Sequence, residues 1–150
     1  MTIYYLESSA LVKLYVRELG TERLLKLAAS GAANKFAVLS LASVEVRSAV
    51  RRRERAGEID SVAADRLLAR FQRHLEGKFL KQALTDSVLD VASVLVDRHG
   101  LRAYDAVQLS GYLALRTISG VEVPVFVCAD RVLLEAAQGE KLAVLDPCSP

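Results

Sequence analysis

The sequence has little cysteine, proline and glycine and no tryptophan, and each shortage excludes a class of protein. Its 150 residues include two cysteines, three prolines and eight glycines. Two cysteines cannot build a scaffold of several disulfides, and so few glycines and prolines exclude a collagen-like repeat. Hydrophobic residues make up 52% of the chain, which excludes an intrinsically disordered protein. Length and apolar content together predict one domain, residues 1–150, with a substantial core.

Long apolar runs and export signals are also missing. No apolar run approaches the roughly 20 residues that a membrane-spanning helix needs, and no basic segment precedes the first apolar residues. Cys128 lies in an apolar run and Cys148 lies near the end of the chain, and neither belongs to a CxxC pair. We therefore expect two free thiols without metal or redox work, a cytoplasmic location and no membrane partner.

The net charge of +2 conceals a strongly basic segment. Between Arg47 and His74 the chain has eight arginines, four acidic residues and no lysine, a charge of +4 that leaves −2 for the rest. The planar guanidinium group suits phosphate, so this segment indicates a polyanionic partner. Two alternatives stay open: a solvated helical face with Arg/Glu pairs, or contact with an acidic protein.

Apolar periodicity divides the chain into alternating strands and helices. Strands are expected over residues 3–6, 36–39, 79–84, 123–127 and 142–145. Helices are expected over residues 8–15, from 21 onward, 40–56, 60–75, 86–99, 101–118 and 131–138, with Ser8, Ser9, Ser40 and Thr85 as candidate caps. Because the strands are apolar runs, the pattern predicts the α/β class, a three-layer α/β/α sandwich around a mostly parallel sheet of about five strands. Such sheets bind ligands outside the carboxyl ends of their strands.

Four acidic residues from distant parts of the sequence are expected at that edge. Glu7 follows the first strand and Asp130 follows the strand over 123–127. Glu45 lies early in the helix after the second strand, and Asp105 lies near the start of the 101–118 helix. Each carboxylate alone is also explained as a helix cap or a partner of the helix dipole. Glu45 and Asp105 have apolar neighbours in the sequence, however, where a carboxylate needs a partner.

Four carboxylates held close together need a cation to neutralise their repulsion. Oxygen ligands without cysteine or histidine point to Mg²⁺ or Mn²⁺, and such a site suits metal-assisted phosphodiester hydrolysis. Neither a GxxxxGK[ST] nor a GxGxxG loop is present, which argues against nucleotide binding. His74 and His99 are isolated near expected helix ends, so neither is assigned a catalytic role.

Four segments together resemble a PIN domain, specifically the VapC-type toxin ribonuclease branch. They span nearly the whole chain and read IYYLESSALVKLYVRELG, LSLASVEVRSAVRRRERAGEI, VLDVASVLVDRHGLRAYDAVQLSGYLAL and VFVCADRVLLEAA. The most specific element is HGLRAYDA, followed about 25 residues later by a strand that ends before an acidic residue.

The resemblance implies a PIN-like fold and a Mg²⁺- or Mn²⁺-dependent endoribonuclease, the toxin of a type II toxin–antitoxin system. It further implies a homodimer, an RNA substrate and a small antitoxin partner. By position, Glu7, Asp105 and Asp130 match the metal-binding acids of the family, and Glu45 matches the acid that orients or deprotonates the attacking water. Ser9 matches the polar residue beside the first acid.

Two positions depart from the family pattern. Glu7 stands where aspartate is usual, and Cys128-Ala129-Asp130 replaces the usual T-x-D. An alternative hypothesis is therefore a catalytically weakened PIN-fold module that binds RNA or protein. A phosphotransfer receiver-like domain is a third, although the paired acids it needs after the first strand are missing. The candidate contacts with RNA or antitoxin are Arg51, Arg52 and Arg55.

Overall fold

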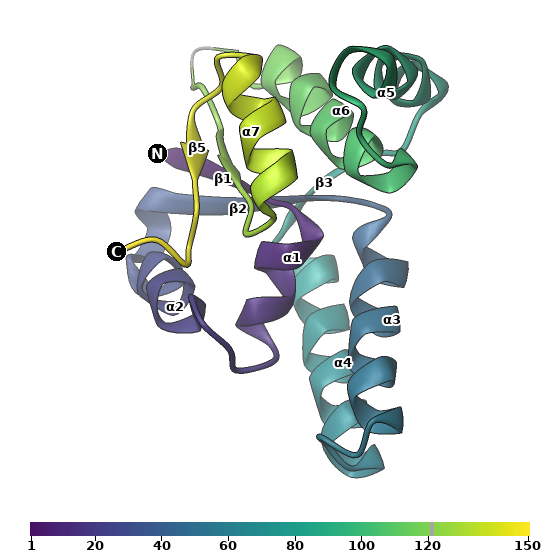
Figure 1. Ribbon diagram of the computed structural model, residues 1–150. Helices are drawn as coiled ribbons and strands as arrows, with labels where there is room; N and C mark the ends of the chain where they lie inside the picture. The colour runs from purple at the N-terminus through teal and green to yellow at the C-terminus, as the bar shows by residue number, and fades with distance from the viewer. Residues whose placement is uncertain (121) are drawn as a thin grey trace.

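Five parallel strands form one central sheet in the order β3-β2-β1-β4-β5 (Figure 1). The computed structural model describes residues 1–120 and 122–150. The strands are β1 (Thr2–Leu6), β2 (Asn34–Leu39), β3 (Leu80–Gln82), β4 (Val125–Val127) and β5 (Val144–Leu145). This arrangement confirms the predicted three-layer α/β/α fold, and the sheet is parallel throughout these five strands.

Helices cover both faces of the sheet. They are α1 (Ser8–Leu11), α2 (Thr21–Ala29), α3 (Ala42–Arg55), α4 (Ser61–Gly77), α5 (Asp86–His99), α6 (Ala103–Ile118) and α7 (Arg131–Gly139), with short 3-10 helices at Val12–Leu14 (η1) and Gly31–Ala33 (η2). In Figure 1, α5, α6 and α7 lie above the sheet and α1 to α4 lie below it, with α3 and α4 extending downward side by side. Across the described residues, no helix combines the length and apolar character needed to cross a membrane.

Two hydrophobic cores lie on the two faces of the sheet, because successive strand residues point to opposite sides. Tyr5 packs above the sheet against Tyr112 and Phe126, with ring centroids 5.8 and 5.9 Å away. The adjacent Leu6 packs below it, in the core formed with α1 to α4. Both faces of the strands are therefore buried, which explains their continuous apolar sequence.

Three of the observed strands are shorter than predicted. β4 begins at Val125 rather than Val123, after Pro124, which has no backbone N–H for a strand ladder and whose carbonyl accepts a hydrogen bond from the Tyr112 hydroxyl. β3 ends at Gln82, and the next residues leave the sheet, with the Leu84 N–H donating to the Ser40 hydroxyl. β5 contains only Val144 and Leu145.

The helix caps follow the prediction at one helix and differ at two others. The Thr85 hydroxyl caps α5 as expected, accepting from the Val88 N–H at 3.2 Å. The Ser40 prediction is wrong, because α3 begins at Ala42 and the Ser40 hydroxyl is used by Leu84. Glu7, rather than a serine, caps α1.

Candidate active site

A groove of about 710 Å³ opens at the carboxyl edge of the sheet. Its walls come from the ends of β1 and β4, from α1 and η1, from the first three turns of α3 and from the start of α6. The structure brings all four predicted carboxylates to this groove: Glu7, Glu45, Asp105 and Asp130. The parallel topology accounts for this convergence, because it places the carboxyl ends of β1 and β4 at one edge.

Glu7 is the most deeply buried of the four, at 4% exposed. Its backbone N–H donates to the Val127 carbonyl at 3.0 Å, which ties the end of β1 to β4. Its side chain caps α1 by accepting from the Ser9 N–H at 3.0 Å. Burial raises the pKa of the Glu7 carboxyl to about 7, despite hydrogen bonds from Ser9 and Cys128 that oppose the increase, and the nearby Glu45 raises it further.

Ser9 links the two strand ends that carry Glu7 and Asp130. Its hydroxyl donates to Glu7 Oε2 and accepts from the Ala129 N–H at 3.0 Å. The thiol of Cys128 lies 3.8 Å from the same hydroxyl. Cys128 is a buried free cysteine, as predicted, and burial raises the pKa of its thiol well above the usual range. The Cys128 thiol therefore stays protonated and packs beside Ser9, next to Glu7.

Asp105 and Asp130 are held in different ways. Asp105 is buried in the first turn of α6, where Arg102 Nε lies 3.4 Å from its Oδ2 atom. Burial raises the pKa of Asp105, Arg102 lowers it, and the nearby Asp130 raises it. Asp130 caps α7, with Oδ1 accepting from the Leu133 N–H at 2.9 Å. The capping alternative therefore holds for Glu7 and Asp130, each through one oxygen of a carboxylate that also lines the groove.

Glu45 has a partner that the sequence analysis did not single out. Gln108 Nε2 donates to Glu45 Oε1 at 2.6 Å, and Gln108 is fully buried on α6, one turn after Asp105. Burial raises the pKa of Glu45, and the hydrogen bond from Gln108 opposes that increase. The available sequence signal was a glutamine three residues after Asp105 in a largely apolar helix, but its partners come from other segments.

The donor set of the groove fits a hard divalent cation in its chemistry. Its oxygen donors are carboxylates that raise one another's pKa, a repulsion that a cation would relieve. Within residues 1–120 and 122–150, no three histidine, cysteine, aspartate or glutamate side chains already surround a point suited to a metal ion. The metal and catalytic roles of these residues therefore stay predictions.

The basic residues that line the groove differ from the three predicted contacts. Arg52 lines the groove, whereas Arg51 forms ion pairs with Glu54 at 3.1 Å and Asp65 at 2.9 Å on the α3–α4 hairpin. Arg55 is exposed in the last turn of α3. Lys13, which the sequence analysis did not single out, lines the groove at 7% exposed.

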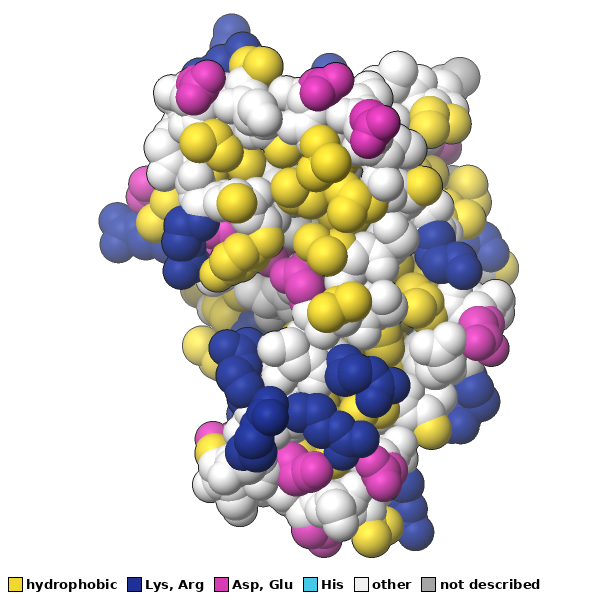
Figure 2. Space-filling model, turned by 90° about the vertical axis from the view of Figure 1, so that its right-hand side faces the viewer, with side chains coloured by type: hydrophobic (Ala, Val, Ile, Leu, Met, Phe, Trp, Pro, Cys, Tyr) yellow, Lys and Arg dark blue, Asp and Glu magenta, His cyan; other side chains and the backbone are white. Residues whose placement is uncertain are grey.

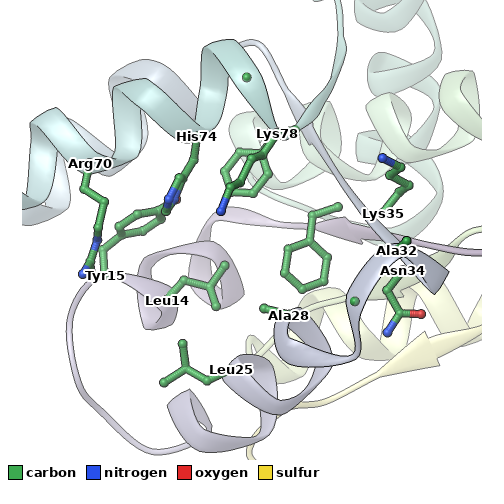
Figure 3. A pocket seen from close by; sticks show the side chains of 14 residues that line it. Leu14, Tyr15, Leu25, Ala28, Ala32, Asn34, Lys35, Arg70, His74 and Lys78 are labelled. Carbon is green, nitrogen blue, oxygen red and sulfur yellow. The ribbon is translucent and has the colours of Figure 1, made fainter.

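A second hollow, of about 450 Å³, lies below the sheet between α4, η1 and α2 (Figure 3). Arg70 and His74 project from α4, and Lys78 from the residue after its end, toward η1 and α2. Tyr15 joins the two sides, because its hydroxyl lies 2.7 Å from His74 Nδ1 and its ring centroid lies 5.4 Å from the Arg70 guanidinium carbon. In the part of the chain that the structure describes, no acidic residue lines this hollow. Its larger apolar side chains are Leu14, Leu25, Phe36 and Phe79.

A third surface is apolar and exposed. Figure 2 shows hydrophobic side chains gathered over the upper half of the molecule, around α5, and basic side chains below them over α3 and α4. On α5 itself, Leu89 is 45% exposed and Val94 is 50% exposed. Leu84, just before α5, and Tyr104, in the first turn of α6, are also exposed. We call these residues the α5 apolar face.

Solved structures match the chain along nearly its whole length. A toxin–antitoxin complex from Klebsiella pneumoniae matches with 14% identity and a TM-score of 0.64, covering 96% of this chain and 97% of that chain. VapBC2 from Rickettsia felis, bound to a DNA fragment from their promoter, matches with 14% identity and a TM-score of 0.60, covering 96% and 98%. PAE2754 from Pyrobaculum aerophilum matches with 26% identity and a TM-score of 0.62, covering 95% and 83%. No protein-family model and no curated protein matches the sequence.

Proposed function

We propose that this chain, which has the fold of VapC-type PIN domains, is the toxin of a toxin–antitoxin pair and an endoribonuclease that uses a divalent cation. The observation that carries the proposal is the convergence of four carboxylates from four segments on one groove at the carboxyl edge of the sheet. The structural neighbours that are toxin–antitoxin complexes support the toxin assignment. The burial of Glu7 also supports the cation: it raises the pKa of the carboxyl to about 7, so ionisation at this position favours a bound positive charge.

The proposed chemistry divides among the groove residues. A Mg²⁺ or Mn²⁺ ion held by Glu7, Asp105 and Asp130 would supply charge neutralisation and Lewis acidity for phosphodiester hydrolysis. Glu45 orients the attacking water and accepts its proton, and its carboxylate is held by a hydrogen bond for that task. Ser9 fixes the Glu7 carboxylate against the end of β4.

The basic residues of the groove are the proposed contacts to RNA phosphates. Arg52 lines the same groove as the carboxylates and is exposed, so it can meet the backbone beside the cleaved bond. Lys13 also lines the groove, but it is 7% exposed and paired with Glu18 at 2.9 Å, which makes it a weaker candidate. Arg51 is already paired with Glu54 and Asp65, which makes it a weaker candidate for RNA than Arg52. Contacts of this kind read the backbone, and RNA is the substrate class they support.

The antitoxin is proposed to use the second hollow as well as the acidic groove. The hollow has an apolar floor and a basic rim of Arg70, Lys78 and Lys35. A segment with apolar and acidic side chains is complementary to both features. The fold relatives include toxin–antitoxin complexes, which supports a protein partner of this kind.

A homodimer is proposed through the α5 apolar face. Exposed apolar residues that gather on one face mark an interaction surface more often than scattered ones do. The face lies on α5, above the sheet, whereas the second hollow lies below it. A second copy of the chain can therefore cover the α5 apolar face while the hollow stays open to the antitoxin.

Cleavage of a single-stranded RNA by the purified chain tests the proposed activity. Wild type should cleave with Mn²⁺ and stop with EDTA, and Asp105→Asn should lose at least about 100-fold in rate, because it removes a proposed cation ligand. Asp97→Asn, an exposed change on α5, is the matched control and should keep the wild-type rate. A loss below about tenfold in Asp105→Asn would contradict the assignment.

A further inference from the structure

Gln108 is a buried polar side chain at the junction of four elements. It lies on α6 at 0% exposed, and its amide contacts residues of β1, α1 and α3. Its Nε2 atom donates to Glu45 Oε1 at 2.6 Å and to the Ser8 hydroxyl at 3.0 Å. Its Oε1 atom accepts from the Tyr5 hydroxyl at 3.0 Å. Both amide hydrogens and the amide oxygen are therefore used.

Tyr5 holds the far end of the Gln108 amide, opposite Glu45. Burial raises the pKa of the Tyr5 phenol well above its usual value, so the hydroxyl stays protonated and can donate. It donates to the Gln108 side-chain oxygen and is also 2.9 Å from the Gln108 backbone carbonyl. An ionised Glu45 carboxylate only accepts hydrogen bonds, so the NH₂ group faces Glu45 and Ser8 and the amide oxygen faces the Tyr5 hydroxyl.

The consequence of this network lies in the groove. Glu45 is only half-buried and lies in the first turn of α3, so α3 alone leaves its side chain free to rotate. The short hydrogen bond from Gln108 ties it to α6, the helix that carries Asp105. We propose that Gln108 is a positioning residue that holds the Glu45 carboxylate in place for the cleavage reaction, an inference that rests on the proposed function.

Gln108 would make the same contacts if it only stabilised the fold. The test therefore needs a control that separates a stabilising role from a positioning role. Ser110 is that control, because it lies on the same helix, is 1% exposed and donates to the Val88 carbonyl at 2.6 Å, outside the groove. Ser110→Ala and Gln108→Met each remove one buried polar side chain from α6. Tyr5→Phe is a milder variant that releases the amide without removing it.

The expected results separate kcat from stability. Gln108→Met should lower kcat by about 10- to 100-fold with KM and Mn²⁺ affinity unchanged, as is typical of residues that orient a functional group. Tyr5→Phe should lower kcat by part of that factor. Ser110→Ala should lower the melting temperature and keep kcat. In a Glu45→Gln background, Gln108→Met should cost almost nothing further, because its effect passes through Glu45.

The outcomes that overturn the inference are distinct from those that overturn the proposed function. A wild type without metal-dependent cleavage overturns the proposed function. A cleaving wild type in which Gln108→Met keeps kcat, or in which the Gln108 and Glu45 losses multiply, overturns this inference alone. The ¹H–¹⁵N resonances of the Gln108 side-chain amide give a readout without activity. They should shift in Glu45→Gln, and an unchanged resonance would contradict the contact.

Discussion

At the scale of single residues, Glu7 serves two purposes with one carboxylate. It caps α1 through the Ser9 N–H, and it lines the groove where the proposed cation would bind. Burial disfavours the ionised carboxylate and raises its pKa to about 7, from 4.5 for an ordinary glutamate. The folded chain therefore holds this proton more tightly than the unfolded chain does, which makes stability depend on pH.

The metal-free protein should become less stable as pH rises. The stability that the raised pKa of Glu7 confers is fully present below about pH 4.5 and is lost as pH rises through about 7. The loss amounts to about 3 kcal/mol for this group, and the raised pKa values of Glu45 and Asp105 act in the same direction. Thermal melting between about pH 5 and pH 8 measures it.

Glu7→Gln is the control for that measurement. It keeps an oxygen for Ser9 but cannot ionise, so its melting temperature should fall less across the same range. Mn²⁺ added at the upper pH should restore the wild type, because a cation replaces the proton. An equal slope in wild type and Glu7→Gln would contradict the raised pKa of Glu7.

At the scale of elements, α6 is the helix on which the candidate site depends. It carries Asp105 and Gln108, and it approaches the sheet closely at Gly111. A Cβ atom built on Gly111 would lie 2.6 Å from the Tyr5 hydroxyl and 2.9 Å from Leu39 Cδ1. The absence of a side chain at Gly111 therefore lets α6 bring its polar residues to the ends of β1 and β2.

Gly111→Ala should destabilise the protein by about 1–3 kcal/mol, because the new methyl group must displace Tyr5 and Leu39. Gly77→Ala is the matched control, since Gly77 also lies in a helix and a Cβ there meets nothing within 4 Å. It should be neutral or stabilising, by up to about 1 kcal/mol. Denaturant unfolding of both variants checks this. Equal effects would show that α6 does not approach the sheet closely at Gly111.

The sequence predicted the elements well and their ends less well, for physical reasons. Apolar runs located each strand. However, β4 begins only after Pro124, and β3 ends before Leu84, whose N–H donates to the Ser40 hydroxyl instead of to a neighbouring strand. Periodicity also located α6 and the acids at the strand ends. It could not identify Gln108, because the three side chains that its amide contacts come from β1, α1 and α3. Contacts between distant segments exist only once the chain has folded.

At the scale of the whole molecule, the weak net charge of +2 separates into distinct surfaces. Five carboxylates, the four predicted ones and Glu18, line the groove, whereas basic residues rim the second hollow and cover α3 and α4. The resemblance to PIN domains is confirmed by structural neighbours, at the level of the fold. The roles in RNA cleavage, antitoxin binding and dimerisation were not fixed by that fold, because function depends on particular sites.

The proposed dimer gives a prediction at this scale. Wild type should sediment at twice the 16.4 kDa of one chain, and Val94→Asp, which places a charge in the α5 apolar face, should sediment as a monomer. Val62→Asp is the control, because Val62 is 57% exposed on α4, away from that face. A monomeric wild type, or an equal effect of Val62→Asp, would contradict an interface at α5.

The central claim is that the acidic groove holds a divalent cation, and calorimetric titration of Mn²⁺ into the purified chain tests it most directly. Near neutral pH we expect saturable binding below about millimolar Mn²⁺ that releases protons, since Glu7 must ionise. Asp105→Asn should abolish most of that binding, and Asp97→Asn should keep it. Absence of Mn²⁺ binding to wild type up to about millimolar concentration would contradict the account and favour a fold that binds RNA or protein without cleaving it.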